Sequence, residues 1–400
     1  MGNKKGGGVT YPYGFFAAGI HAGIKKNGEK DLSLIYSHLP CVAAGAFTTN
    51  KFKSYSVIWS IKNIKNPVYA VIINSGNANA CNGKENYSKT KEVVKKLAEK
   101  LNIKENNILF SSTGIIGKPL PYSEIISSFD ELIKNLSRDK HKEAAEGITT
   151  TDTFIKEFQV DTGIEGRKKI VSIGGMAKGA GMINPDMATM LSFITTDAVI
   201  EKKALDIALK EGVNNSFNMI TVDNDTSTND MVVCLANGAA RNKRIHYGTK
   251  DYFEFAEKLK ETCVNLAKMI AKDGEGATKF IEVKVKGGWC EKDAKRVAKK
   301  VCGSNLVKTA IYGNKANWGR IISSVGSCKA KFKPEKVEIK ICGIDVFKGE
   351  PLDFDEKLLE EKLKEKEILI EIDLKKGKFE ATGWGCDLTE EYVRINKGYE

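Results

Sequence analysis

The chain has 400 residues, of which 42% are hydrophobic and 28% charged, and its formal net charge is +12. This length can bury a substantial core in one large domain or in two of ordinary size. The apolar runs are too short to span a bilayer, and no apolar stretch follows the charged N-terminal residues as in an export signal. We therefore expect a soluble, cytoplasmic protein.

The positive charge comes mainly from lysines spread over segments that are also rich in glutamate, such as residues 93–106 and 360–367. Such segments are typical of solvated helix faces. Nucleic-acid-binding modules gather arginine with aromatic residues or carry a known motif, and neither is present. Nine cysteines without a CxxC pair and four histidines far apart in sequence predict reduced thiols and no metal site.

The first half of the chain alternates strand-like and helix-like segments. Residues 32–50 and 68–76 are apolar and β-branched, which predicts strands, whereas residues 87–101 repeat apolar side chains at helical spacing. Residues 154–175 alternate polar and apolar positions around a glycine-containing stretch at 162–166, which predicts a hairpin.

After residue 189 we expect strands at 190–200 and 231–238 and helices at 201–217 and 251–274. From about residue 281 the predicted elements become shorter: strands at 281–288, 337–349 and 368–377, and helices at 291–303 and 356–367. The sequence thus predicts a main α/β domain at residues 1–280 and a smaller α+β lobe at residues 281–400.

The segment 174–196 leads from a glycine-rich loop into Ala188 and Thr189 and then into an apolar run. If the Ala188–Thr189 bond is cut, Thr189 carries a hydroxyl and a free α-amine, the nucleophile-plus-base pairing of N-terminal-threonine enzymes. Gly179 and Gly181 would let the loop take the tight path needed for the attack. The alternative is that Thr189 simply begins a strand, where β-branched residues are common.

Acyl transfer at a threonine also needs donors for the oxyanion and groups that hold the substrate. The Thr113 hydroxyl and the Gly114 N–H are candidate donors, because they lie in a glycine-rich turn after an apolar run; an ordinary flexible turn is the alternative. Lys178, among glycines, is a candidate for binding a carboxylate or for lowering the proton affinity of the nucleophile, and a surface lysine is its alternative. Glu275, between two glycines, is a candidate acceptor for a substrate ammonium.

Two polar clusters are denser than composition predicts. Residues 148–154 place three consecutive hydroxyls before Asp152, and residues 220–231 contain three acids, Asp223, Asp225 and Asp230. The second cluster resembles a cation loop but lacks the central glycine and the terminal glutamate of an EF-hand. We therefore expect a hydrogen-bonded structural loop there.

Taken together, these segments closely resemble the ornithine acetyltransferase (glutamate N-acetyltransferase) family of arginine biosynthesis. The motifs that carry the resemblance follow one another along nearly the whole chain: AGAFTTN (44–50), NSGNANACNG (74–83), SSTGIIG (111–117), TTDTF (150–154), GGMAKGAGMINPDMATML (174–191), DNDTSTND (223–230), DGEGATK (273–279), VKTAIYGNKANWGRI (307–321), ATGWGCDL (381–388) and YVRIN (392–396).

The resemblance implies an α/β (α+β) fold, a layered sheet-and-helix sandwich of the N-terminal-nucleophile-like type with a smaller C-terminal lobe. It implies autocatalytic cleavage between Ala188 and Thr189 into chains 1–188 and 189–400, which assemble as an α2β2 heterotetramer. A ping-pong reaction would then move acetyl from N-acetylornithine to Thr189 and on to glutamate, without a cofactor. Some members also accept acetyl-CoA as donor.

The resemblance also assigns site residues by motif. Thr113 and Gly114 match the oxyanion hole, and the residues that match substrate contacts are Thr150, Lys178, Thr189, Glu275 and Asn396. The chain departs from the family at Asn224, where glycine is usual, and beyond Asn396, where a hydroxyl residue is usual. The alternative is an N-terminal-threonine amidohydrolase or aminopeptidase, which would use Thr189 in the same way but pass the acyl group to water.

Overall fold

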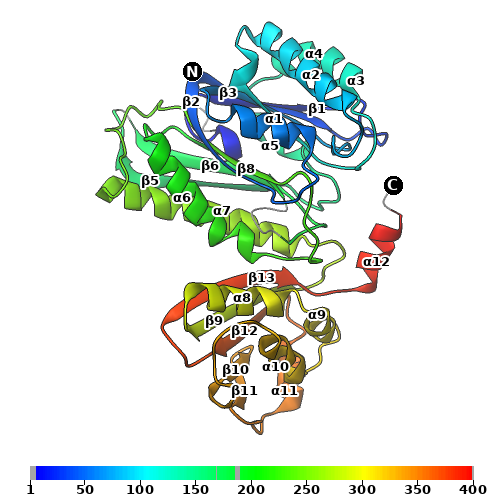
Figure 1. The fold of residues 1–400 in the computed structure, drawn as a ribbon, viewed down its shortest axis with the longest axis vertical. Coiled ribbons are helices and arrows are strands. Elements are labelled where there is room, and N and C mark those ends of the chain that lie inside the picture. Colours follow the sequence, from blue (N-terminus) through cyan, green and yellow to red (C-terminus); the bar gives the residue numbers. More distant parts are fainter. Residues whose placement is uncertain (1–5, 168, 185–189, 399–400) are drawn as a thin grey trace. The chain divides into compact units, whose positions relative to one another are not determined.

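The computed structural model describes residues 6–167, 169–184 and 190–398. They divide into two compact units: unit 1 takes in Met1–Gly179, Asp186–Phe217 and Thr226–Leu266, and unit 2 takes in Ala180–Pro185, Asn218–Asp225 and Ala267–Glu400. Each unit contains one sheet with helices packed on it, so the predicted α/β class is confirmed (Figure 1). The domain boundary expected near residue 281 stays a prediction.

Unit 1 is built on an eight-stranded sheet in the order β4-β3-β2-β8-β7-β6-β5, with β1 also paired to β2. Its strands are β1 (Phe15–Ile20), β2 (Leu32–Phe47), β3 (Val68–Asn74), β4 (Ile108–Ser112), β5 (Lys156–Glu165), β6 (Ile170–Lys178), β7 (Leu191–Thr196) and β8 (Met231–Ala236). The long strand β2 joins the sheet together, because its first part pairs with β1 and β3 and its last part pairs with β8. The β3–β4 and β7–β8 pairs are parallel.

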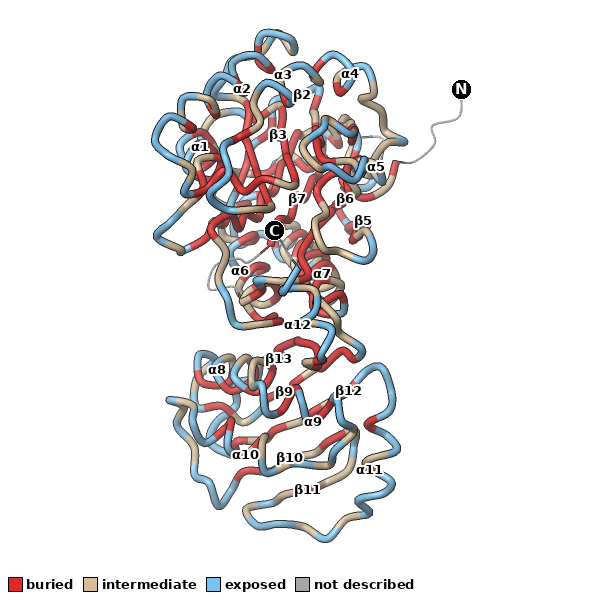
Figure 2. The backbone as a smooth tube through the Cα atoms, turned by 90° about the vertical axis from the view of Figure 1, so that its right-hand side faces the viewer, coloured by how far each residue is buried: buried red, intermediate tan, exposed pale blue. Residues whose placement is uncertain are grey.

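The helices of this part of the chain are α1 (Tyr55–Asn63), α2 (Glu85–Leu101), α3 (Tyr122–Ser127), α4 (Phe129–Lys134), α5 (His141–Glu146), α6 (Lys202–Asn214) and α7 (Lys250–Lys272), and α7 crosses the unit boundary after Leu266. Alternate residues of β3 enter two different cores, Val71 and Ile73 one of them and Ala70 and Ile72 the other. Because both faces of β3 are covered, its sequence is continuously apolar instead of alternating. Figure 2 shows the same pattern as buried backbone running through the strands.

Helix α7 packs on β6, and α6 packs on β2 and β8 beside it. A side-chain carbon added at Gly175 on β6 would lie 3.0 Å from a Leu266 methyl carbon, and one added at Gly212 on α6 would lie 3.3 Å from the Cys263 sulfur on α7. These short separations show that α7 packs closely on both the strand and the neighbouring helix. Helices α6 and α7 thus form a layer on one face of this sheet (Figure 1).

The hairpin expected at 154–175 is confirmed as the antiparallel pair β5–β6. Its turn lies later than we expected, because β5 continues through Thr162 and Gly163 to Glu165 and the chain reverses at Gly166, whose N–H donates to the Lys169 carbonyl at 2.7 Å. A register shift between Asp161 and Glu165 absorbs the extra residues as a bulge. The helix expected at 356–367 is also shorter in the structure and ends at Lys362.

Unit 2 contains a five-stranded sheet in the order β11-β10-β12-β9-β13. Its strands are β9 (Phe280–Gly288), β10 (Glu338–Ile341), β11 (Ile344–Lys348), β12 (Glu367–Asp373) and β13 (Phe379–Cys386), and its helices are α8 (Glu291–Cys302), α9 (Asn305–Tyr312), α10 (Trp318–Gly326), α11 (Glu356–Lys362) and α12 (Glu390–Lys397). Helix α8 buries Ala294, Val297, Ala298 and Val301, which share one face at helical spacing. This stripe packs close to β13, where a side-chain carbon added at Gly383 would lie 3.1 Å from the Ala298 backbone.

Among the helices in the described part of the chain, none combines the length and apolar character needed to cross a bilayer. All nine cysteines are free thiols, and five of them are buried.

Candidate functional site

The predicted site residues fall into two groups, one in each unit. Thr113, Gly114, Thr150 and Lys178 belong to unit 1, and Glu275 and Asn396 belong to unit 2. Ala188 and Thr189 lie outside the described residues. The position of the expected cleavage therefore stays a prediction, and the two groups are described in turn.

Thr113 and Gly114 directly follow strand β4. The Thr113 N–H donates to the Asn74 carbonyl at 3.0 Å, so the turn is tied to the end of β3. Gly114 has φ of +132°, and a side-chain carbon there would come within 2.4 Å of the Gly76 carbonyl carbon. Only glycine fits this close approach of two backbones, which explains the residue type in physical terms.

Side-chain amides hold the turn from the other side. Asn229 donates to the Ser112 carbonyl at 2.7 Å and to the Ala78 carbonyl at 2.6 Å, and Asn74 donates to the Asn77 carbonyl at 2.9 Å. Buried amides of this kind satisfy carbonyls that no strand partner reaches. The sequence analysis did not single out Asn229 or Asn74, although both lie in the quoted polar motifs.

Lys178 brings three of the predicted residues together. It is the last residue of β6, and its Nζ lies 2.7 Å from the Thr150 Oγ1 and 3.4 Å from the Thr113 Oγ1. Its side chain is only 9% exposed. The ammonium donates and the hydroxyl oxygens accept. Lys178 is therefore a buried residue of the site, and the alternative of an ordinary surface lysine is excluded.

Asp152 and Lys156 belong to the same cluster, and sequence reasoning did not predict their role. Both side chains are fully buried, with Lys156 Nζ 2.6 Å from Asp152 Oδ1, and Lys178 Nζ lies 4.0 Å from Oδ2. Oδ1 also accepts from the Gly179 N–H at 2.7 Å, and Oδ2 from the Thr150 N–H at 3.0 Å. Burial alone would raise the pKa of Asp152, but the Lys178 and Lys156 charges and these hydrogen bonds outweigh it and hold the pKa at about 2.

A second acid near Lys178 behaves in the opposite way. Asp230 lies just before β8, is 2% exposed, and its Oδ2 has no hydrogen-bond partner among the described residues. Burial raises the pKa of Asp230 well above its ordinary value, although the Ser227 and Thr48 hydroxyls, the Lys178 charge and the Met190 N–H act against that shift. Asp230 thus keeps its proton at pH values where an exposed aspartate has lost it. Two acids around one lysine with opposite protonation preferences are typical of catalytic sites.

In unit 2 the structure brings Glu275 and Asn396 together. Asn396 Nδ2 donates to Glu275 Oε2 at 2.8 Å, and it also donates to the Tyr392 carbonyl one turn earlier on α12. The Glu275 N–H donates to the Ala180 carbonyl at 3.0 Å. A side-chain carbon at Gly181 would lie 2.3 Å from the Glu275 carboxyl group, so a larger residue there would displace that carboxylate.

The acidic segment that begins at Asp223 acts as a hydrogen-bonded loop. Asp223 accepts from the N–H groups of Met182 at 2.6 Å and Ile183 at 2.9 Å, and the Tyr392 hydroxyl lies 3.4 Å from it. Burial raises the pKa of Asp223, and burial together with the Asp223 and Glu275 charges raises the pKa of Tyr392. Within the residues that the structure describes, no three side chains of the metal-binding types come together.

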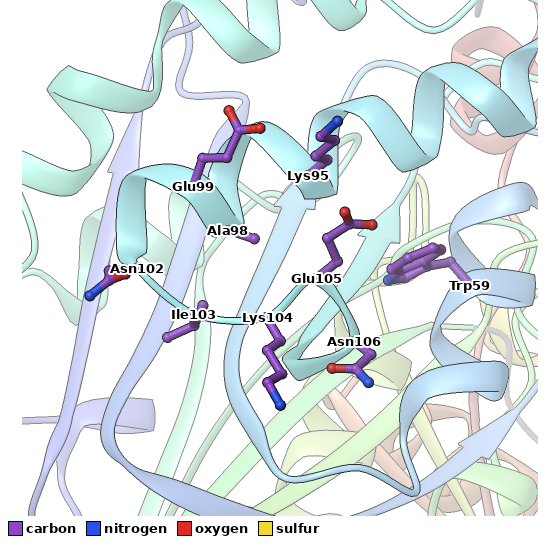
Figure 3. A pocket seen from close by; sticks show the side chains of 9 residues that line it. All are labelled: Trp59, Lys95, Ala98, Glu99, Asn102, Ile103, Lys104, Glu105 and Asn106. Atoms are coloured by element: carbon purple, nitrogen blue, oxygen red, sulfur yellow. The ribbon is translucent and has the colours of Figure 1, made fainter.

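A hollow of about 580 Å³ lies in unit 1 near the C-terminal end of α2 (Figure 3). Lys95 and Glu99 of α2 and Trp59 of α1 line it, together with the loop that follows α2. The Trp59 indole N–H already donates to the Ile108 carbonyl at 2.9 Å. None of the predicted site residues lines this hollow, so it has no part in the proposed chemistry.

The unit 1 cluster has the parts needed to stabilise a developing negative charge: an ammonium, two hydroxyls and a turn fixed by backbone contacts. The β6–β7 pairing sets Lys178 opposite Leu191, the first residue of β7. Leu191 follows Thr189 by two positions in the sequence.

Comparison with known proteins gives a consistent result. Residues 16–400 match the model of the ArgJ family. The chain is 48% identical to the arginine biosynthesis bifunctional protein ArgJ of Symbiobacterium thermophilum and 47% identical to the protein of the same name from Caldanaerobacter subterraneus subsp. tengcongensis, in both cases over 98% of each chain. It is also similar to the crystal structure of the arginine biosynthesis bifunctional protein argJ from Bacillus halodurans, with 48% identity and a TM-score of 0.51. That match covers 98% of the solved chain but 52% of this one.

Proposed function

The chain belongs to the ArgJ family, and from this membership we propose that it is a glutamate N-acetyltransferase of arginine biosynthesis, which moves acetyl from N-acetylornithine to glutamate. Relatives named for arginine biosynthesis match it over nearly their whole length. Those relatives are named bifunctional, so the proposal includes acetyl-CoA as a second acetyl donor. The same proposal places the enzyme in the cytoplasm as an α2β2 assembly.

The proposed reaction has two acyl transfers at Thr189. After the chain is cut, the α-amine of Thr189 takes the hydroxyl proton while Oγ1 attacks the acetyl carbonyl of N-acetylornithine; the carbon–nitrogen bond breaks, and ornithine leaves with the proton. The amine of glutamate then attacks the acetyl-threonine ester and restores the free hydroxyl. An acetyl group that moves between two amines changes little in free energy, so a preorganised site suffices without an organic cofactor.

The observation that carries the proposal is the position of Lys178. Its ammonium contacts the Thr113 and Thr150 hydroxyls at the strand position paired with Leu191. In this proposal Thr113 and Gly114 stabilise the oxyanion of each transfer, and Lys178 and Thr150 bind the substrate. The substrate contacts given to Glu275 and Asn396 rest on the motif match.

The length of the matched solved chain supports the cleavage step. A cut between Ala188 and Thr189 would leave chains of 188 and 212 residues (400 − 188). Nearly all of the solved B. halodurans chain covers only 52% of this sequence, although the two are 48% identical. A half-length chain is what such a cut would give.

The decisive experiment is Thr189→Ala, which removes the hydroxyl needed both for cutting and for transfer. Denaturing electrophoresis and intact-mass analysis should show two chains in the wild type and one folded, inactive chain of 400 residues in the variant. Thr189→Ser is the matched control, because it keeps a hydroxyl and should still be cut. A Thr189→Ala protein that is cut at the same bond, or a wild type that is active while intact, would contradict the proposal.

The runner-up function, an amidohydrolase that uses the same threonine, differs in what accepts the acetyl group. Purified protein incubated with N-acetylornithine should release ornithine steadily only when glutamate is present, because a transferase keeps water from the acyl-enzyme. Ornithine release at the same rate without glutamate would favour the hydrolase.

A further inference from the structure

We propose that Asp152 is a positioning residue of the transfer reaction: its buried carboxylate fixes where the Lys178 ammonium lies, with Lys156 as the counter-cation. The contacts that support this are those of unit 1 alone. The catalytic consequence rests on the proposed function, because it depends on Lys178 binding the substrate.

The carboxylate joins two separate segments that carry predicted site residues. Oδ2 accepts from the Thr150 N–H and Oδ1 accepts from the N–H of Gly179, the residue that follows Lys178. Thr150 belongs to the loop before β5, and Lys178 ends β6. One side chain thus sets the distance between the Lys178 ammonium and the Thr150 hydroxyl, which is 2.7 Å. Backbone hydrogen bonds to a carboxylate are stronger than bonds to a neutral acceptor, so this distance is well defined.

Charge balance explains why an acid stands at position 152. The Lys156 side chain is fully buried and that of Lys178 is 9% exposed, and both ammonium groups lie within 4.0 Å of the carboxylate. Two buried cations without an anion between them would repel each other and be poorly solvated. An asparagine at position 152 would offer only one acceptor oxygen. Its NH2 group would face a backbone N–H or an ammonium, which are also donors.

The balance also predicts what the cluster binds. Two ammonium groups and one carboxylate leave a net charge of +1, and the neighbouring Asp230 adds little negative charge because burial favours its neutral form. A buried site with one net positive charge is complementary to one anionic group, such as the α-carboxylate that both amino-acid substrates carry. Asp152 therefore leaves the cluster enough positive charge to attract the substrate anion, but not so much that the buried cations destabilise the fold.

The test uses the double variant Asp152→Asn with Lys156→Met, because Asp152→Asn alone would remove the carboxylate that pairs with the buried Lys156 ammonium. The double variant removes the ion pair as a unit and should still fold and be cut. Asp152→Glu is a second variant, which keeps the charge but moves the carboxylate by one methylene. Lys169→Met is the matched control, because it removes a cation paired with another fully buried carboxylate, that of Asp197, and Lys169 lies just before β6 whereas Lys178 ends that strand.

For the double variant we expect KM for glutamate to rise by about tenfold or more, since a misplacement of about 1 Å can cost on the order of a hundredfold. The alkaline limb of the kcat/KM profile should move down by about one pH unit, because Lys178 loses the carboxylate that lies 4.0 Å from its ammonium. Asp152→Glu should raise KM while leaving the alkaline limb near its wild-type position. Lys169→Met should leave KM for glutamate and the alkaline limb near their wild-type values.

The outcomes separate this inference from the proposed function. A wild type that transfers no acetyl contradicts the proposed function itself. The role of Asp152 alone is contradicted if the wild type transfers acetyl, both variants have the wild-type KM for glutamate, and the double variant keeps the wild-type alkaline limb. If the double variant fails to fold, Asp152→Glu decides, because it keeps both charges of the ion pair. A wild-type KM for glutamate in Asp152→Glu would then contradict the role of Asp152.

Discussion

The two groups of predicted site residues differ in how the protein holds them. In unit 1, Lys178 and Thr113 are each less than a tenth exposed and lie at the ends of β6 and β4. In unit 2, Asn396 lies on α12, a helix without a single buried residue, and its bond to Glu275 is exposed to solvent. The first group is fixed by strands, buried amides and an ion pair, whereas the second depends on a short surface helix.

This difference teaches where each group can contribute most. Fixed donors in a place shielded from water stabilise a developing charge without any rearrangement, so burial favours the unit 1 cluster for the chemical step. An exposed polar contact contributes little, because water competes for both partners. We therefore expect substitutions in unit 1 to lower kcat/KM strongly and substitutions in unit 2 to lower it weakly.

The largest expected effect is that of Lys178→Met, which tests whether the buried cluster carries the chemistry. Methionine keeps most of the side-chain length but removes the charge. Asp152 keeps Lys156 as a partner at 2.6 Å, so the fold should survive. We expect kcat/KM for acetyl transfer to fall by about 10²–10³-fold, because the variant loses both the charge assigned to substrate binding and the contact that holds the Thr113 hydroxyl of the proposed oxyanion hole. Steady-state kinetics and a melting curve measured side by side would separate loss of rate from loss of fold.

Lys169→Met is the control for that experiment. Lys169 lies just before β6, at the opposite end of the strand from Lys178, and it too pairs with a fully buried carboxylate, that of Asp197, at 2.6 Å. Its loss should lower the melting temperature but leave kcat/KM within a few-fold of the wild type. If the two variants reduced kcat/KM equally, the special position assigned to Lys178 would be wrong.

A smaller effect is expected from Asp230→Asn, which tests whether the two buried acids near Lys178 have opposite pH dependences. Burial raises the pKa of Asp230, so the folded chain holds this proton more tightly than the unfolded chain does. Its stabilising contribution is therefore complete below about pH 4 and is lost as the pH rises toward the folded-state pKa. Asparagine cannot ionise and has no such loss.

The free energy of unfolding of Asp230→Asn, relative to the wild type, should thus increase between pH 3.5 and pH 7, by on the order of 1 kcal/mol for each unit of raised pKa. Urea unfolding at both pH values measures this. Asp152 has the opposite dependence, because its pKa is lowered to about 2 and its contribution is present above about pH 4 and lost below it. It is unchanged in the variant, so it cancels in the comparison. A pH-independent difference would show that Asp230 ionises normally.

Local sequence patterns predicted those residues of the candidate site that lie in short glycine-rich motifs. Thr113, Gly114 and Lys178 stand out because glycines surround them next to apolar runs, and the structure places them at strand ends. Asp152 stood in a noticed cluster of hydroxyls, but its partners Lys156 and Gly179 are known only once β5 and β6 are paired. Its role therefore needed the tertiary structure.

The segments that make up unit 2 show that prediction of the fold from sequence has the same limit. Strand and helix periods predicted the residues of β9 to β12 and of α8 and α11, but they missed α9, α10, β13 and α12. The short segments 180–185 and 218–225 also belong to this unit. Long-range hydrogen bonds join them to it, among them those from the Glu275 N–H to the Ala180 carbonyl at 3.0 Å and from the Thr221 N–H to the Trp384 carbonyl at 3.0 Å. Periodicity carries no information about such contacts.

The smallest expected effect is that of Glu275→Gln, which tests the exposed group. Glutamine keeps the shape and can still accept from Asn396, so only the charge is lost. Because Glu275 is partly exposed, we expect KM for N-acetylornithine to rise only by about threefold to tenfold, with cleavage of the chain complete. Glu380→Gln, at an exposed acid on β13, is the matched control and should leave KM unchanged. An uncut Glu275→Gln protein would mean that this residue also acts in the cleavage of the chain. A loss of rate as large as that of Lys178→Met would show that the buried and the exposed group contribute equally, against the difference that their contacts indicate.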